Sequence, residues 1–87
     1  MTYAVIIPKP VQKQIKSLPK TVAKRIALRL KELADEPRPQ GAIKMKGSKN
    51  DYRIRIGDYR VCYAIKDTEL VVLVLRCDHR KNVYRKK

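Results

Sequence analysis

The stretch YRIRIGDYRVCYAI, residues 52–65, decides the fold. Apolar and polar side chains alternate on both sides of Gly57-Asp58, which is the period of a β-strand, and this dipeptide suits a tight hairpin turn. A two-residue loop at Gly57-Asp58 places Arg55 directly opposite Arg60. The stretch therefore predicts two antiparallel strands that share one apolar face.

Three arginines share the other face of this predicted hairpin. Arg53 follows the same alternation as Arg55 and lies diagonal to Arg60. Like charges directly opposite one another destabilise a sheet, and the planar guanidinium fork suits phosphate, so the arrangement indicates an anion site. Two alternatives stay open. The arginines protect an edge strand against aggregation, or a three-residue loop places Arg60 on the opposite face.

Three further segments are predicted strands. Residues 43–46 alternate apolar and lysine side chains, and residues 3–7 form a short, β-branched run closed by prolines. Residues 70–75 are apolar at every position, which predicts a central strand covered on both sides.

Two helices are predicted between the first strand and the others. Pro19 separates them and lies at or near the first position of the second helix, where a missing N–H costs nothing. Eight basic residues and no acidic one lie between Lys9 and Lys31, on the outer faces of this hairpin. Apolar residues recur every three or four positions, at Val11, Ile15 and Leu18 and then at Val22, Ile26, Leu30 and Leu33. The predicted fold is α+β: an N-terminal strand, a two-helix hairpin, then an antiparallel β-meander, with the helices packed on one face of the sheet.

Length and charge limit the class of protein. The 87 residues suit one domain, residues 1–87, which is too small for a deep enzyme cavity. The chain has 22 Lys and Arg against 8 Asp and Glu, a net charge of +14, yet it is 44% hydrophobic and so is not a disordered basic tail. Such a charge favours a polyanionic partner, nucleic acid first and an acidic protein second. With no apolar run long enough to span a membrane and no signal-peptide pattern, we expect a cytoplasmic protein.

The C-terminal segment holds the candidate acid–base groups. A two-residue turn at Asp67-Thr68 places Leu75 opposite Arg60, so the residues after Leu75 emerge near the arginines. His79 is a candidate because histidine is the side chain that ordinarily exchanges protons near neutral pH, and Tyr84 is another because surrounding cations make a tyrosine a better base. The alternatives are a structural hydrogen-bonding role for His79 and a packing role for Tyr84.

The two cysteines are not expected to bind metal. Cys62 and Cys77 lack a Cys-x-x-Cys spacing and form no zinc set with the one histidine, His79. We expect both to be reduced core residues, and we predict no metal and no cofactor.

The order of elements, with YRIRIGDYRVCYAI followed by LVVLVLRCDHRKNVY, resembles the RelE-type toxins of the RelE/ParE superfamily, and the resemblance covers essentially the whole chain. It implies a small basic toxin of a type II toxin–antitoxin system that enters the ribosomal A site and cuts the mRNA there. The implied reaction is attack of a ribose 2′-hydroxyl on the adjacent phosphate, which leaves a cyclic phosphate and a 5′-hydroxyl end.

The resemblance also implies roles for individual residues. The first three arginines orient the phosphate and stabilise its charge, Tyr84 is the base, and Arg80 contacts the phosphate or the leaving oxygen. Arg76 is a second candidate for the C-terminal arginine, and His79 or water for the proton donor, because a guanidinium is a very weak acid. The residues that match the family's catalytic positions are Arg53, Arg55, Arg60, Arg80 and Tyr84. The expected RNA-binding residues are Lys44, Lys46, Lys49, Lys81 and Arg85.

The chain departs from the family pattern at two places. Arg53 and Arg55 stand where the best-known members have a lysine pair, which argues against a lysine as proton carrier. Asp78 stands where many relatives have a small residue, so either Arg80 or Arg76 matches the catalytic arginine.

Partners follow from the same resemblance. We expect an acidic, RelB-like antitoxin that lies across the helical hairpin and the basic face, together with the ribosome and mRNA, no membrane, and operator DNA only through the antitoxin complex. Two other functions stay open: inhibition of DNA gyrase without catalysis, as in the ParE branch, and a basic RNA- or ribosome-binding domain without catalysis.

Overall fold

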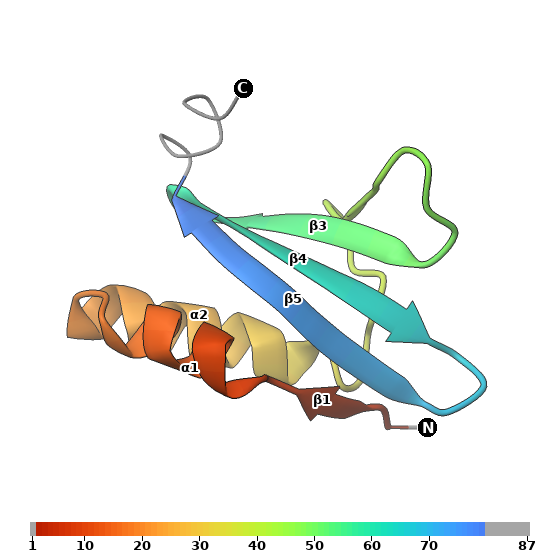
Figure 1. Ribbon diagram of the computed structural model, residues 1–87, viewed down its shortest axis with the longest axis horizontal. Coiled ribbons are helices and arrows are strands. Elements are labelled where there is room, and N and C mark those ends of the chain that lie inside the picture. Colours follow the sequence, from red (N-terminus) through yellow and green to blue (C-terminus); the bar gives the residue numbers. More distant parts are fainter. Residues whose placement is uncertain (1, 80–87) are drawn as a thin grey trace.

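The computed structural model describes residues 2–79 and places them in five strands and two helices (Figure 1). The elements are β1 (Ala4–Ile6), α1 (Lys9–Lys16), α2 (Lys20–Glu32), β2 (Ile43–Lys44), β3 (Asp51–Ile56), β4 (Tyr59–Lys66) and β5 (Val71–His79). The five strands form one sheet in the order β1-β5-β4-β3-β2. β1 runs parallel to β5, and each other neighbouring pair is antiparallel. The predicted α+β arrangement is confirmed.

Prolines set where the two helices begin. Pro8 and Pro19 directly precede α1 and α2, and their carbonyls accept the backbone N–H of Gln12 and Ala23, each at 2.9 Å. Because proline has no N–H to donate and disfavours a helical residue before it, one helix ends and the next begins at Pro19. Both helices lie on the same side of the sheet (Figure 1). Neither of them is long and apolar enough to cross a membrane.

The core lies between the helices and one face of the sheet. Alternate residues of β3, β4 and β5 point toward the helices, where α1 contacts β5 and α2 contacts β3. No helix of residues 2–79 covers the other face, which stays open (Figure 1). The buried core residues are Ile54, Ile56, Val61, Tyr63, Ile65, Val72, Val74 and Cys77 from the strands, with Val11, Ile26, Leu30 and Leu33 from the helical hairpin.

The connection between β4 and β5 differs from the expected two-residue turn. Lys66 pairs with Val71, so the loop holds four residues, and its last residue, Leu70, has a positive φ of 56°. The favoured two-residue turns need positive φ at one or both central residues, and Asp67-Thr68 has no glycine to adopt it at low cost. The longer loop replaces that turn, and Leu70 belongs to the loop instead of the strand.

A bulge changes the register of β5 a second time. The pairing shifts between Cys62 and Tyr63, which leaves Leu75 without a cross-strand Cα partner. Arg60 consequently faces Asp78, and the prediction that it faces Leu75 was wrong. β5 does lie between β1 and β4, but the helices cover only one of its faces, and Leu75 is 41% exposed. The prediction of a strand covered on both sides was therefore wrong as well.

A polar network joins the loop after α2 to the turn between β4 and β5. Arg38 donates from both terminal nitrogens to the Asp67 carboxylate, at 2.8 and 3.3 Å, and from Nε to the Tyr52 hydroxyl at 3.1 Å. The Tyr3 hydroxyl donates to the same carboxylate at 2.6 Å. Arg38 and Tyr3 together hold the pKa of Asp67 below its usual value. The network thus fastens the N-terminal strand and the loop to one end of the sheet.

A buried tyrosine also binds the loop that follows α2. Tyr63 is 0% exposed, and its hydroxyl donates to the carbonyl of Pro37 at 2.8 Å. Burial raises the pKa of Tyr63 to about 12, because a phenolate would lose its hydration.

Replacing Tyr63 by phenylalanine tests this bond. We expect Tyr63→Phe to lower the free energy of unfolding by about 1 kcal/mol at neutral pH, because the Pro37 carbonyl loses its donor. The folded pKa of about 12 lies above the unfolded value of about 10. The stabilisation from the protonated hydroxyl is therefore complete below pH 10 and is lost as the pH rises toward 12. Urea unfolding at about pH 7 and pH 11 measures both effects.

The difference in stability between wild type and Tyr63→Phe should shrink at the higher pH, since only the wild type can lose this proton. Parallel losses of stability in the two proteins would mean that burial does not hold the hydroxyl in its neutral form.

Candidate nucleic-acid interface

The open face of the sheet carries the predicted arginines. Arg55 lies opposite Arg60 across the β3–β4 hairpin, and Arg53 lies opposite Cys62 on the same face, which confirms the predicted register. Arg55 is exposed, while Arg53 and Arg60 are half-buried against their neighbours. The Arg55 Nε donates to the carbonyl of Gly57 at 3.0 Å, which holds its guanidinium at the turn. Rigid strands thus place three cationic groups side by side.

β5 adds a fourth arginine to this face. Arg76 pairs with Cys62 across the sheet, and its Nε donates to Oδ2 of Asp78 at 2.7 Å. Asp78 in turn lies opposite Arg60. We call Arg53, Arg55, Arg60 and Arg76 the arginine face. Asp78 offsets part of its charge and orients Arg76.

Cys62 lies beneath these arginines. Its side chain is only 4% exposed, yet it points to the open face, between Arg53 on one strand and Arg76 on the other. Burial raises the pKa of the Cys62 thiol, although the charge of Arg76 acts in the opposite sense. Cys77 lies in the core on the helix side, where burial raises its pKa to about 11. Both thiols are free, as predicted, but only Cys77 belongs to the core between sheet and helices.

His79 lies on the opposite side of the sheet from the arginine face. It pairs with Tyr59, and the two rings meet edge to face with centroids 4.9 Å apart. Both rings line a shallow depression of about 260 Å³ beside α1, with Gln14 and Cys77. The prediction that the residues after Leu75 emerge near the arginines is confirmed for Arg76 and Asp78, but His79 faces the other side of the sheet. The loop and the bulge together shift the register by three residues, and an odd shift moves each later side chain to the other face.

Of the remaining predicted residues, the structure describes some and not others. Arg80, Lys81, Tyr84 and Arg85 lie outside the described residues. Lys44 pairs with Tyr52, whose face is the helix side, whereas Lys46 lies beside Arg53 at the sheet edge. Lys49 is exposed in the segment between β2 and β3.

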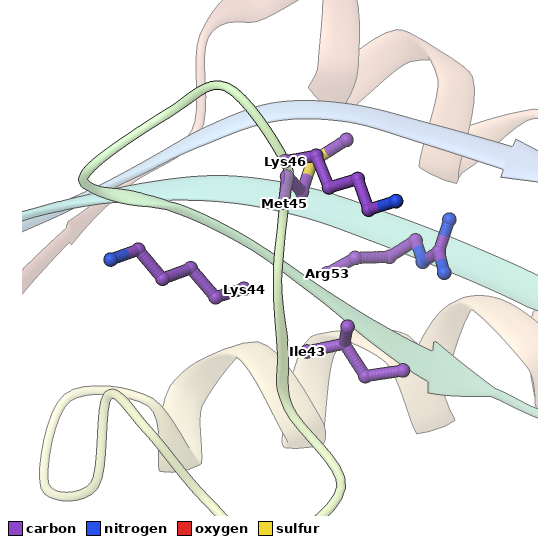
Figure 2. Close-up of a pocket in the computed structure, with 5 residues that line it drawn as sticks. All are labelled: Ile43, Lys44, Met45, Lys46 and Arg53. Carbon is purple, nitrogen blue, oxygen red and sulfur yellow. The ribbon is translucent and has the colours of Figure 1, made fainter.

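A depression at this edge was not predicted from the sequence. It has a volume of about 340 Å³ and is lined by Ile43, Lys44, Met45, Lys46 and Arg53 (Figure 2). The strand predicted for residues 43–46 is shorter than expected, because β2 ends at Lys44. The alternation of apolar residues and lysines predicts that the two faces of this strand differ, but it does not predict which face packs against the helices. In the structure, Ile43 is exposed on the arginine face, opposite Arg53.

Residues 2–79 contain no group of three or more His, Cys, Asp or Glu side chains placed to hold a metal ion. Arginines outnumber the carboxylates of Asp51 and Asp78 on the open face, so this face suits an anion.

Sequence comparison identifies the family. Residues 5–84 match the family described as ParE toxin of type II toxin-antitoxin system, parDE. A protein of Methanocaldococcus jannaschii named as a toxin, RelE1, is 30% identical over 88 aligned positions, which cover 98% of each chain. The chain belongs to the RelE/ParE family of type II toxins. Toxin RelG of Mycobacterium tuberculosis is 29% identical over 87 positions, across 99% of this chain and all of that one.

Solved structures of RelE toxins share the fold. The toxin chain matched in the crystal structure of an archaeal RelE-RelB complex from Pyrococcus horikoshii has a TM-score of 0.83 and 38% identity, over 92% of this chain and 97% of that one. The isolated RelE toxin of E. coli has a TM-score of 0.77 and 27% identity, over 94% and 90% of the two chains. The RelE/ParE fold of this toxin is thus shown by both sequence and structure.

The arginine face of this toxin should weaken its own stability. We expect Arg55→Gln to raise the free energy of unfolding by about 0.2 to 1 kcal/mol at low salt, because it removes one of two like charges placed directly opposite. The gain should largely vanish at about 1 M salt, where charges are screened within about 3 Å. Thermal unfolding with and without inorganic phosphate measures the effect, and phosphate should stabilise the wild type more than the variant.

Lys24→Gln is the matched control, because it removes one positive charge from an exposed position of α2. An equal gain in Lys24→Gln would show that overall charge, not the opposed pair, sets the effect.

Proposed function

We propose that this toxin is an endoribonuclease that cuts mRNA in the ribosomal A site and so inhibits translation in the cytoplasm. The observation that carries the proposal is the direct opposition of Arg55 and Arg60 on an open face, with Arg53 beside them. Stability alone disfavours this arrangement, and the phosphate of a single-stranded message is the ligand whose charge and shape suit it.

The proposed reaction follows from the chemistry of these groups. The ribose 2′-oxygen attacks the adjacent phosphorus and the bond from phosphorus to the 5′-oxygen breaks, which leaves a 2′,3′-cyclic phosphate and a 5′-hydroxyl end. Negative charge grows on the phosphate oxygens as the bond forms. Arg53, Arg55 and Arg60 stabilise that charge from positions fixed by the sheet, without a metal ion or another cofactor. Arg76, which Asp78 orients, makes a further phosphate contact.

The proton transfers are assigned by elimination and by the family resemblance. Tyr84 accepts the 2′-proton, and Arg80 contacts the phosphate or the leaving oxygen. Because a guanidinium is a very weak acid and His79 faces the helix side, water supplies the proton to the 5′-oxygen in this proposal. Arg80 lies outside the described residues, so its role rests on the resemblance, and Arg76, which lies on the arginine face, is the second candidate.

An open face suits an RNA substrate that is held in position by a larger particle such as the ribosome. The depression described beside the arginine face is open and shallow, so the toxin alone would orient a flexible message poorly. In the proposal the ribosome holds the codon in line for attack, while Lys46, Lys49, Lys81 and Arg85 bind RNA around it. Lys44, which extends to the helix side, would contact RNA only beyond this face. Activity on free RNA should therefore be weak.

We propose a cognate acidic antitoxin, RelB-like, as the protein partner. The structures of related toxins from Pyrococcus horikoshii and Methanococcus jannaschii are described as complexes of RelE with RelB, the second with a TM-score of 0.75 and 28% identity. The basic outer surface of α1 and α2 supports the proposal, since neither helix has an acidic residue in its first turn to favour its dipole. An acidic partner would offset the positive charge of the lysines and arginines and that of the helix N-termini. Operator DNA would be contacted only through the toxin–antitoxin complex.

Inhibition of DNA gyrase is the second candidate function. The family description that matches residues 5–84 names ParE, whose branch inhibits gyrase without cutting RNA. The relatives matched over nearly the full chain are named RelE1 and RelG, and gyrase inhibition does not require the arginine face, so we place it second.

Primer extension on a defined message in a purified translation system tests the proposal. We expect wild-type toxin to cut only when ribosomes are present, at the codon in the A site. Arg60→Ala should lower the cleavage rate by at least about a hundredfold, because it removes a group that stabilises the transition state. Tyr84→Phe should lower it by about 10² to 10⁴, the usual size of general-base catalysis.

Lys24→Ala serves as the control, since α2 lies on the far side of the sheet from the arginine face, and it should cut like wild type. An intact message with active ribosomes would remove the nuclease proposal. A gyrase supercoiling assay would then decide between the ParE activity and a binding role in translation.

A further inference from the structure

The depression at the β2 edge adjoins the arginine face but has a different character. Arg53 belongs to both, because it lines the depression and also lies diagonal to Arg60. The other lining residues are two apolar side chains, Ile43 and Met45, and two lysines. A ligand for this surface must therefore combine an apolar surface with negative charge.

Exposure of Ile43 supports a ligand at this place. The side chain is 55% exposed although its cross-strand partner, Arg53, is half-buried. A single exposed apolar residue is ordinary, but this one lies within a hollow beside a half-buried methionine and two cations. Methionine is polarisable and makes favourable contacts with aromatic rings.

Side-chain directions separate the lining residues into two groups. Figure 2 shows Ile43, Lys46 and Arg53 extending toward the same side, while Lys44 extends the opposite way. The register agrees, since Ile43 pairs with Arg53 and Lys44 with Tyr52. One apolar side chain and two cationic groups thus converge on the side that continues into the arginine face.

We propose that this depression is a nucleotide subsite, in which a base of single-stranded RNA lies against Ile43 and Met45 while its phosphate contacts Lys46 and Arg53. The inference rests on the proposed function, because it assigns the nucleotide next to the cleaved bond. A planar base has the apolar faces, and its backbone the charge, that these four side chains match.

The position of the subsite fits neighbouring nucleotides of one strand. Arg53 and Arg55 are two residues apart on β3, which separates them by about 6.8 Å along the strand. That is the scale of the distance between successive phosphates in an extended single strand. The cleaved phosphate at Arg55 and Arg60 therefore leaves the next one near Lys46, with Arg53 between the two phosphates and within reach of both. The subsite volume of about 340 Å³ lies within the range of about 300 to 1,000 Å³ typical of small-ligand sites.

Titration of the full-length isotope-labelled toxin, followed by NMR, tests the subsite without ribosomes. The probes are a 2′-deoxy dinucleoside monophosphate, which cannot be cleaved by this reaction, and inorganic phosphate. We expect the dinucleotide to shift the amide signals of residues 43–46 and 53 and to bind at least about fivefold more tightly than phosphate, since the base adds its own contact.

Variants separate the base contact from the charge contact. Ile43→Ser should weaken dinucleotide binding about fivefold and leave phosphate binding unchanged, whereas Lys46→Gln should weaken both. Leu28→Ser is matched to the first, because Leu28 is 56% exposed on α2, and Lys24→Gln is matched to the second. Neither control should change either affinity.

Three results would overturn the subsite. These are equal affinities of the toxin for dinucleotide and phosphate, equal losses in the variants and their controls, and a change of oligomeric state in Ile43→Ser on size-exclusion chromatography. The last would make this edge a contact between copies. Failure of the nuclease proposal is a separate outcome, because it appears as an uncut message in the ribosome assay while the dinucleotide still binds.

Discussion

The two-residue turn at Gly57-Asp58 is the constraint on which the rest of the structure depends. Gly57 has a φ of 61°, a conformation that glycine adopts at little cost. A Cβ at this position would lie 3.1 Å from a terminal nitrogen of Arg25, so the absence of a side chain also avoids a close contact. The turn sets Arg55 opposite Arg60. A slip of one residue would move the apolar side chains of one strand to the open face and its arginines into the core.

The two faces of the sheet have different roles: one is buried and stabilises the fold, and the other carries the positive charge. Burial of isoleucine, valine and leucine side chains against the helices stabilises the fold, and it does so on one face only. The other face concentrates positive charge, at a cost to stability that the core offsets. Residues 2–79 form two layers, the sheet and the helices, and no helix among them covers the open face (Figure 1). In the proposed function, the ribosome supplies the wall that this face lacks.

The fold of this family does not decide between its activities. RelE and ParE toxins share an arrangement of strands and helices, so an activity on RNA must come from side chains and not from topology. Arginines paired across strands, an apolar hollow at the sheet edge and an aspartate that orients Arg76 belong to one surface. The helical hairpin, on the other side of the sheet, carries exposed lysines, and neither helix has an acidic residue in its first turn. Two surfaces of different character are therefore available to two kinds of partner.

The sequence by itself determined whatever depends on local pattern. Alternation around Gly57-Asp58 predicted the hairpin, its register and the shared face of Arg53, Arg55 and Arg60, and the proline positions predicted the two helices. These features depend on interactions between residues close in the chain, where turn chemistry and side-chain period leave one solution.

Tertiary structure alone decided the register of β5. The four-residue loop that ends at Leu70 and the bulge at Leu75 brought Asp78, instead of Leu75, opposite Arg60 and sent His79 to the helix side. It also decided that Ile43 is exposed beside Arg53. An apolar residue at a sheet edge has the same local pattern on either face, and a strand's register depends on how the whole sheet packs against the helices. Neither choice is encoded in the neighbouring residues.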